Sequence, residues 1–330
     1  LPDSIKTVGS YSFYNCTGLK NVTFSKNLET ISSNAFYNCT SLTSLKLPES
    51  LTTIGYEAFE NCSGLTSIEI PSSVTTIGYE AFENCSGLTS IEIPSSVTTI
   101  NSSVFSGCSG LTSVTLPETL TTISGYAFRN CTSLESIEIP DGVENIAEDA
   151  FYGCTKLSSV KLPLGWKRVT YYSANNANGD ESPFVGCTAL KEVTLPEGMT
   201  AVPSQAFREM TSLETVVLPS TVESIGNYAF YNCSNLEKIW IAQNVSEIGS
   251  NAFYDCSKLT IHGIKDSYAE QYANDNNIPF STDVMVYETS SVLGKVIDEN
   301  GNEISDTKVT IVDSNTGKVL GTYITDSDGS

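Results

Sequence analysis

Residues 62–84 read CSGLTSIEIPSSVTTIGYEAFEN, and the same pattern returns 23 residues later with nearly every apolar position kept. A fixed sequence period of about 20–50 residues is typical of solenoids, in which each repeat forms one coil stacked on its neighbours. The repeat therefore predicts a stack of coils. Apolar side chains recur at fixed places, which in this copy are Leu65, Ile68, Ile70, Val74, Ile77, Ala81 and Phe82.

The cysteines and phenylalanines show how far the repeat extends. Six successive gaps between cysteines are 23 residues, the next is 33, then comes 46 with Met210 in the skipped place, and the last is 23 again. Eleven of the thirteen phenylalanines occupy one place in the pattern. We therefore expect about 11 coils, marked by Phe13, Phe36, Phe59, Phe82, Phe105, Phe128, Phe151, Phe184, Phe207, Phe230 and Phe253.

Each coil contains one stretch that alternates as a strand does. In the pattern Leu-x-x-Ile-x-Ile, successive side chains point to opposite faces, so the apolar ones face the core. Strands at equal places in successive coils then pair as a parallel sheet with a spacing of about 4.8 Å. A proline follows most of these stretches and ends the pairing because it has no N–H.

The signature C-x-x-L-x-x-I-x-I-P-x-x-V-x-x-I-G-x-x-A-F is matched almost fully by the coils from Cys39 to Cys154. It resembles the BspA-type leucine-rich repeats, the 23-residue class of bacterial and protozoan surface proteins, over residues 1 to about 280. The resemblance implies an α/β-type, right-handed solenoid with a parallel sheet on its concave face. It also implies display at a cell surface, with roles in adhesion and protein binding.

Three places depart from the regular repeat. Leu1-Pro2 corresponds to the end of a strand, so we expect the chain to begin inside a coil. The 33-residue gap holds a polar insertion after Val169, which we expect to form a loop. Ser267 and Glu270 form a capping box, and residues 266–275 are expected to be a helix that closes the core.

After a linker at residues 281–291 the character of the sequence changes. Residues 292–330 show β-branched alternation with Asn-Gly and Thr-Gly turns. Gly294 to Asp298, Gly301 and Thr325 to Gly329 resemble the opening half of a carboxypeptidase-regulatory-like β-sandwich. We therefore expect a solenoid with its cap over residues 1–280, followed by the N-terminal half of a β-sandwich.

Composition argues against several functions. The formal charge of −21, from 17 Lys and Arg against 38 Asp and Glu, argues against nucleic acid and anionic membrane surfaces as partners. No apolar run reaches the ~20 residues that span a bilayer. With His262 as the single histidine and no Gly-x-Ser-x-Gly elbow, we expect no catalytic residues, no metal site and no cofactor.

The ten cysteines could suggest five disulfides in an exported protein. Every cysteine, however, occupies the same inward place in its coil. Parallel side chains at a spacing of about 4.8 Å do not reach the ~3.8 Å between Cβ atoms that a disulfide prefers. We expect a ladder of buried free thiols that act as small apolar side chains.

The outward positions of the strands are the candidate ligand contacts. In the first eight coils they carry small or charged side chains, whereas Val217 and Trp240 place apolar groups among the last pairs. Tryptophan is enriched at binding hot spots, although the C-terminal cap could equally fold over Trp240. The candidate contacts on the concave face are Thr215, Val217, Lys238 and Trp240.

These features favour a non-catalytic, secreted or cell-surface bacterial protein that binds an extracellular protein or glycan. Two alternatives stay open. The chain could be a structural spacer that projects another domain of a longer surface protein, or a region that targets a larger exported enzyme. The full-length reading frame would discriminate between these readings.

Overall fold

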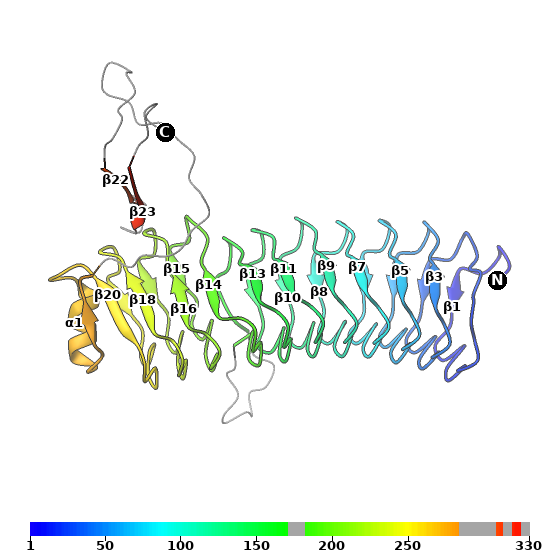
Figure 1. Ribbon diagram of the computed structural model, residues 1–330. Coiled ribbons are helices and arrows are strands. Elements are labelled where there is room, and N and C mark those ends of the chain that lie inside the picture. Colours follow the sequence, from blue (N-terminus) through cyan, green and yellow to red (C-terminus); the bar gives the residue numbers. More distant parts are fainter. Residues whose placement is uncertain (171–181, 284–307, 313–318, 325–330) are drawn as a thin grey trace, which may run out of the picture.

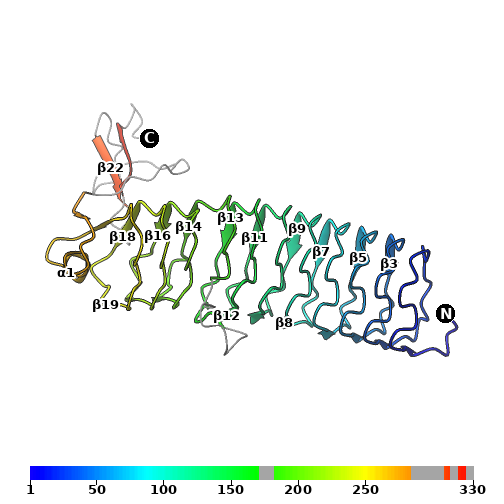
Figure 2. The ribbon, with the colours of Figure 1, turned by 90° about the horizontal axis from the view of Figure 1, so that it is seen from below.

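The computed structural model describes residues 1–170, 182–283, 308–312 and 319–324. The first two ranges form an elongated parallel β-solenoid of about 11 turns, closed by one short helix (Figure 1). Its two rows of strands lie on opposite sides of the stack (Figure 2). The coiled architecture and the number of turns confirm the prediction from the 23-residue period.

The first row of strands is the one expected from the Leu-x-x-Ile-x-Ile pattern. Neighbours pair in parallel with an offset of one repeat, as in Ser44 with Ser67. We call the exposed side of this row the strand face. Its strands are β3 (Ser44–Lys46), β5 (Ser67–Glu69), β7 (Ser90–Glu92), β9 (Ser113–Thr115), β11 (Ser136–Glu138), β13 (Ser159–Lys161), β14 (Glu192–Thr194), β16 (Thr215–Val217), β18 (Lys238–Ile241), β20 (Thr260–Gly263) and β21 (Phe280–Ser281).

A second row of two-residue strands corrects the expected α/β class. In the described coils no helix returns the chain, because a Thr-Ile or similar pair forms a second parallel ladder instead. The isoleucine or valine of each pair is buried. These strands are β1 (Thr7–Val8), β2 (Thr30–Ile31), β4 (Thr53–Ile54), β6 (Thr76–Ile77), β8 (Thr99–Ile100), β10 (Thr122–Ile123), β12 (Asn145–Ile146), β15 (Ala201–Val202), β17 (Ser224–Ile225) and β19 (Glu247–Ile248).

The third side of each coil is a turn centred on the repeated phenylalanine. Successive rings stack with centroids 4.9 to 6.5 Å apart along the molecule. The widest step lies between Phe184 and Phe207, where the ring of Trp166 packs edge-on against both. This continuous aromatic column runs through the core and is fully buried from Phe36 to Phe151.

Backbone hydrogen bonds join each turn to the next, and we call this arrangement the turn ladder. The N–H groups of the phenylalanine and of the residues two places before and after it donate to carbonyls of the following coil. The residues two places before and after the phenylalanine mostly have positive φ, as Glu57 and Asn61 do. This backbone conformation points the three N–H groups of the turn in the same direction. For one junction the bonds are Glu57 N to Tyr79 O at 3.0 Å, Phe59 N to Ala81 O at 2.8 Å and Asn61 N to Glu83 O at 2.8 Å.

The cysteines are free, as predicted, and all except Cys16 are buried. Each buried thiol donates to the carbonyl oxygen of the phenylalanine in the preceding coil. Cys62 Sγ lies 3.2 Å from Phe36 O, and Cys233 Sγ lies 3.0 Å from Phe207 O. The thiols therefore bridge neighbouring coils in addition to filling space.

The last coil is closed by the helix α1 (Tyr268–Asp275), two residues shorter at its start than expected. Ser267 is its N-cap, and its hydroxyl accepts from Glu270 N at 3.4 Å. The Glu270 carboxylate in turn accepts from Asp266 N at 2.6 Å. Ala269 and Ala273 are buried against the core, so the helix closes the last coil as expected.

Beyond residue 283 the structure describes only β22 (Lys308–Val312) and β23 (Val319–Ile324), which pair antiparallel. The rest of the expected linker and β-sandwich lies outside the described residues. The same holds for residues 171–181 of the expected polar loop.

Candidate functional site

The strand face presents a regular polar surface. In β5 and β7 the central isoleucine is buried, while the serine and glutamate on either side of it are exposed. The threonine that precedes β5, β7 and β9 bonds to the coil before it, as Thr112 Oγ1 does to Thr89 O at 3.0 Å. Pairing of the backbone and of these hydroxyls holds the exposed row rigid, because each coil fixes the next.

Two hollows cross the strand face. One, of about 670 Å³, extends over β5, β7 and the end of β9, and the other, of about 390 Å³, lies over β9, β11 and Lys161. The charged residues that line the larger hollow are Glu69, Glu92 and Glu118, with no lysine or arginine among them. The smaller hollow adds Glu138 and Lys161. This part of the face therefore suits a partner that brings positive charge.

The four candidate contacts lie together near the C-terminal end of the same face. Thr215 in β16 is paired with Lys238 in β18, and Trp240 is paired with His262 in β20. Lys238 is exposed, and Thr215 and Val217 are half-buried. The exposed fraction of Trp240 is only 9%. The residues are adjacent, but the indole offers little surface to a partner.

An acidic cluster on the turns was missed by the sequence analysis. One carboxylate oxygen each of Glu57, Glu60 and Glu80 lies within 4.8 Å of the others. Burial, followed by the charges of Glu57 and Glu83, raises the pKa of Glu60 to about 7. Burial and the Glu80 charge also raise the pKa of Glu83. Proton uptake relieves this repulsion at mildly acid pH.

The signal for this cluster was present in the sequence. Residues 55–60 and 78–83 both read GYEAFE, so identical units in adjacent coils place like charges one above the other. Three carboxylate oxygens are fewer than the six to eight oxygens that Ca²⁺ usually takes. Exposed tyrosines border the cluster, and hydrogen bonds to the Glu57 and Glu80 carboxylates raise the pKa of Tyr56.

Farther along the turns, arginines lie over tyrosine rings. The Arg129 guanidinium lies 5.3 Å from the ring centre of Tyr126 and 5.2 Å from that of Tyr152. The guanidinium of Arg208 lies 5.0 Å from the ring centre of Tyr231. A flat cation on a tyrosine ring is thus a repeated element of this surface, with a gain of roughly 0.5–1 kcal/mol at exposed sites.

The residues considered for chemistry are placed in structural roles. Burial raises the pKa of the Cys85 and Cys108 thiols, the second to about 12, which keeps them protonated and poorly nucleophilic. His262 is half-buried, with Nδ1 3.1 Å from the Asp283 carbonyl oxygen.

No helix within the described part of the chain has the length and apolar character needed to cross a bilayer.

Comparison with known proteins gives one family. The sequence model of the BspA type leucine rich repeat region, found in 6 copies, matches residues 1–111, 76–181 and 179–277. No curated protein matches the chain.

Several solved structures are similar to this chain. A leucine-rich repeat protein from Bacteroides ovatus ATCC 8483 is 25% identical with a TM-score of 0.49, and the match covers 83% of this chain and 86% of that one. A leucine rich cell surface protein from Faecalibacterium prausnitzii A2-165 is 28% identical with a TM-score of 0.45, covering 81% of this chain and 85% of that one. A leucine-rich repeat protein from Eubacterium ventriosum ATCC 27560 is 25% identical with a TM-score of 0.47, covering 77% and 74%. Because the family match extends over most of the sequence, the chain belongs to the BspA-type leucine-rich repeat family.

Proposed function

We propose that this chain is a non-catalytic interaction module of a bacterial cell surface, and that it binds an extracellular protein through the strand face. Membership of the BspA-type family supports an interaction role. The location at a cell surface is part of the proposal and rests on the same family resemblance. The face offers rigid exposed strands, and most specific protein interfaces need only ~800 Å² per partner.

The observation that carries the proposal is the acidic hollow over β5, β7 and β9. Three glutamates, and no lysine or arginine, line a depression of about 670 Å³. Complementary charge accelerates encounter and suppresses wrong partners. We therefore infer that the ligand presents a lysine- or arginine-rich surface, and that binding weakens as salt screens the attraction.

The C-terminal end of the face is a second contact region within the same proposal. Lys238 is exposed, and Val217 adds a half-buried apolar group beside it. Trp240, which is 9% exposed, supports its neighbours more than it meets a ligand. A ligand that spans the whole face would touch both the acidic hollow and this end.

The test is binding of the purified chain to a panel of extracellular matrix proteins and glycans at two salt concentrations. Glu92→Lys changes the charge within the hollow, and Glu247→Lys makes the same change on the opposite row, where the residue is also exposed. We expect a saturable protein hit that Glu92→Lys weakens at least tenfold and Glu247→Lys leaves unchanged. Lys238→Ala and Trp240→Ala then test the second region.

Three outcomes contradict the proposal. Equal effects of the two charge reversals would remove the strand face as the site. Binding to glycans but to no protein would change the ligand class from protein to glycan. No hit across the panel would favour the spacer reading, in which the stiff stack only holds another domain at a distance.

A further inference from the structure

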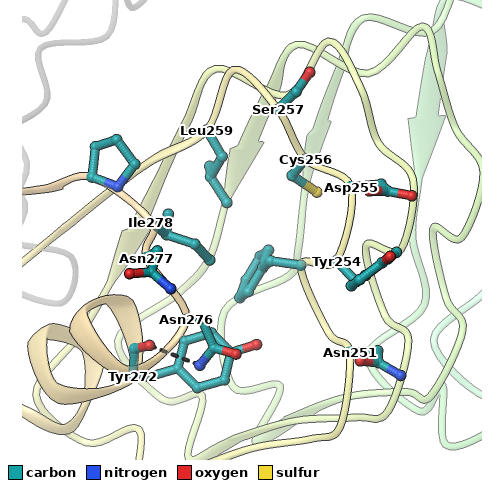
Figure 3. A pocket seen from close by; sticks show the side chains of 12 residues that line it. Asn251, Tyr254, Asp255, Cys256, Ser257, Leu259, Tyr272, Asn276, Asn277 and Ile278 are labelled. Atoms are coloured by element: carbon teal, nitrogen blue, oxygen red, sulfur yellow. Dashed lines mark hydrogen bonds between the residues drawn. The ribbon is translucent and has the colours of Figure 1, made fainter.

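A cavity of about 290 Å³ separates the last coil from its cap (Figure 3). The turn that carries Asn251, Tyr254 and Asp255 forms one wall, and Tyr272 and Ile278 lie on the opposite side. The cavity lies on the turn side of the solenoid and shares no lining residue with the two hollows of the strand face.

The cavity is where the turn ladder stops. The coil of Phe230 still bonds to its neighbour through three N–H groups. The last coil has the equivalent N–H groups at Asn251, Phe253 and Asp255, and in the described part of the chain no following turn receives them. The preceding junction is made by Tyr228 N to Ser250 O at 3.0 Å, Phe230 N to Ala252 O at 2.8 Å and Asn232 N to Tyr254 O at 2.8 Å.

The cap replaces only the apolar half of the missing coil. The Tyr272 ring packs edge-on against Phe253 at 6.1 Å, where the next phenylalanine would stack. Burial raises the pKa of Tyr272, and a hydrogen bond from the Phe253 backbone opposes that rise. Among the described residues, the N–H groups of Asn251 and Asp255 have no acceptor. Their φ angles of 55° and 61° match those of the donors in earlier turns.

We propose that this cavity is a peptide-binding site that takes one turn of a partner protein, whose backbone carbonyls complete the turn ladder. The exposed N–H groups of Asn251 and Asp255 are four residues apart. In interior coils the two equivalent N–H groups bind two carbonyls of a single turn in the next coil. Asp255 is the only charged residue that lines the cavity, so an anionic ligand would be repelled and a neutral carbonyl is the matching acceptor. Completing unpaired backbone groups is the source of affinity in strand-addition complexes as well.

Tyr254 adds specificity for the incoming turn. Its ring is 54% exposed and stacks on the Tyr231 ring, with the two centroids 5.4 Å apart. Tyr37 stacks on Tyr14 in the same way, with centroids 4.8 Å apart. A turn docked in register would place its own side chain on the free side of the Tyr254 ring. A tyrosine of the partner at this position would extend the stack of Tyr231 and Tyr254. An arginine would lie on the Tyr254 ring as Arg129 lies on Tyr126, and it would face Asp255.

The test is an amide NMR titration of the full chain with a synthetic peptide. The peptide has the sequence of residues 227–234, NYAFYNCS, with Phe230→Gly because Tyr272 already fills the phenylalanine place, and Cys233→Ser to prevent oxidation. We expect saturable shifts at the Asn251 and Asp255 amides, and at least tenfold slower hydrogen exchange there. The Tyr254→Ala variant should bind about 2- to 12-fold more weakly, from the energy of one ring–ring contact.

Tyr14→Ala is the matched control, because Tyr14 occupies the same column in the first coil and does not line the cavity. It should leave peptide binding unchanged. The proposal is overturned if the two amides do not respond to millimolar peptide, or if the shifts appear on the strand face instead. Equal shifts with an N-acetylated oligosaccharide and none with the peptide would also overturn it, in favour of a glycan. Each outcome is independent of the charge-reversal test of the strand face.

Discussion

Replacing Phe105 by alanine should reveal how much of the stability resides in the aromatic column. The ring is fully buried, and its centroid lies 5.6 Å from that of Phe82 and 5.5 Å from that of Phe128. A Phe→Ala change in a core typically costs about 3–5 kcal/mol, because the void collapses only partly. Two lost ring contacts, at roughly 0.5–1.5 kcal/mol each, place this site in the upper part of that range, about 4–5 kcal/mol.

The matched change is Phe13→Ala in the first coil. Phe13 is only half-buried and stacks on one ring, that of Phe36 at 4.9 Å. We expect a loss of about 1–2 kcal/mol there, from one ring contact and partial burial.

Urea unfolding followed by circular dichroism measures both changes. Each coil of a solenoid contacts only its neighbours, so a weakened interior coil can also split the transition. Hydrogen exchange by mass spectrometry should therefore show faster exchange first in the coils on either side of Phe105. Equal losses for the two variants, or a loss under about 2 kcal/mol for Phe105→Ala, would refute the role assigned to the column.

Three further predictions concern single residues. Because the pKa of Glu60 is raised to about 7 in the folded chain, the folded state binds the proton more tightly than the unfolded state. The stabilisation of the folded state by proton binding at Glu60 is present below the ordinary carboxyl pKa and is lost as pH rises through 7. Glu60→Gln should therefore raise the melting temperature at pH 8 and change it little at pH 4, and an equal rise at both would contradict the argument. A thiol reagent should label Cys16 at once and the buried cysteines only on unfolding, as read by mass spectrometry. Ser267→Ala should cost about 1 kcal/mol through loss of the N-cap, with faster amide exchange in α1 but not in β5.

The parts of the fold that depend on a single coil were predictable from the sequence. The buried centre of β5 follows from alternation around Ile68, and the N-cap at Ser267 follows from local side-chain chemistry. The second row of strands was less evident, because two residues such as Thr76–Ile77 are too short to show a period. Their pairing arises only when the next coil supplies the same two residues alongside.

Features that depend on contact between coils could not be predicted in the same way. The outward position of Trp240 left open whether the indole is exposed or covered, because alternation within a strand does not show what packs over its outward side. In the structure the indole is 9% exposed. The thiol bonds are another case, since Cys62 finds its acceptor 26 residues earlier, at Phe36, and the repeat length alone does not indicate which carbonyl that is.

Identical coils place like charges next to one another, and the resulting repulsion is limited where the sequence of a coil differs from that of its neighbour. Where two coils share the unit GYEAFE, carboxylates stack in register and the pKa values of Glu60 and Glu83 rise. The next coil has Ser106 at the equivalent place, and its hydroxyl donates to Glu83 at 3.2 Å. The coil after that has Arg129, whose charge lowers the pKa of Glu83. A third identical unit would extend the repulsion along the turns. The residues that differ between coils therefore both limit this repulsion and give each part of the surface its own charge.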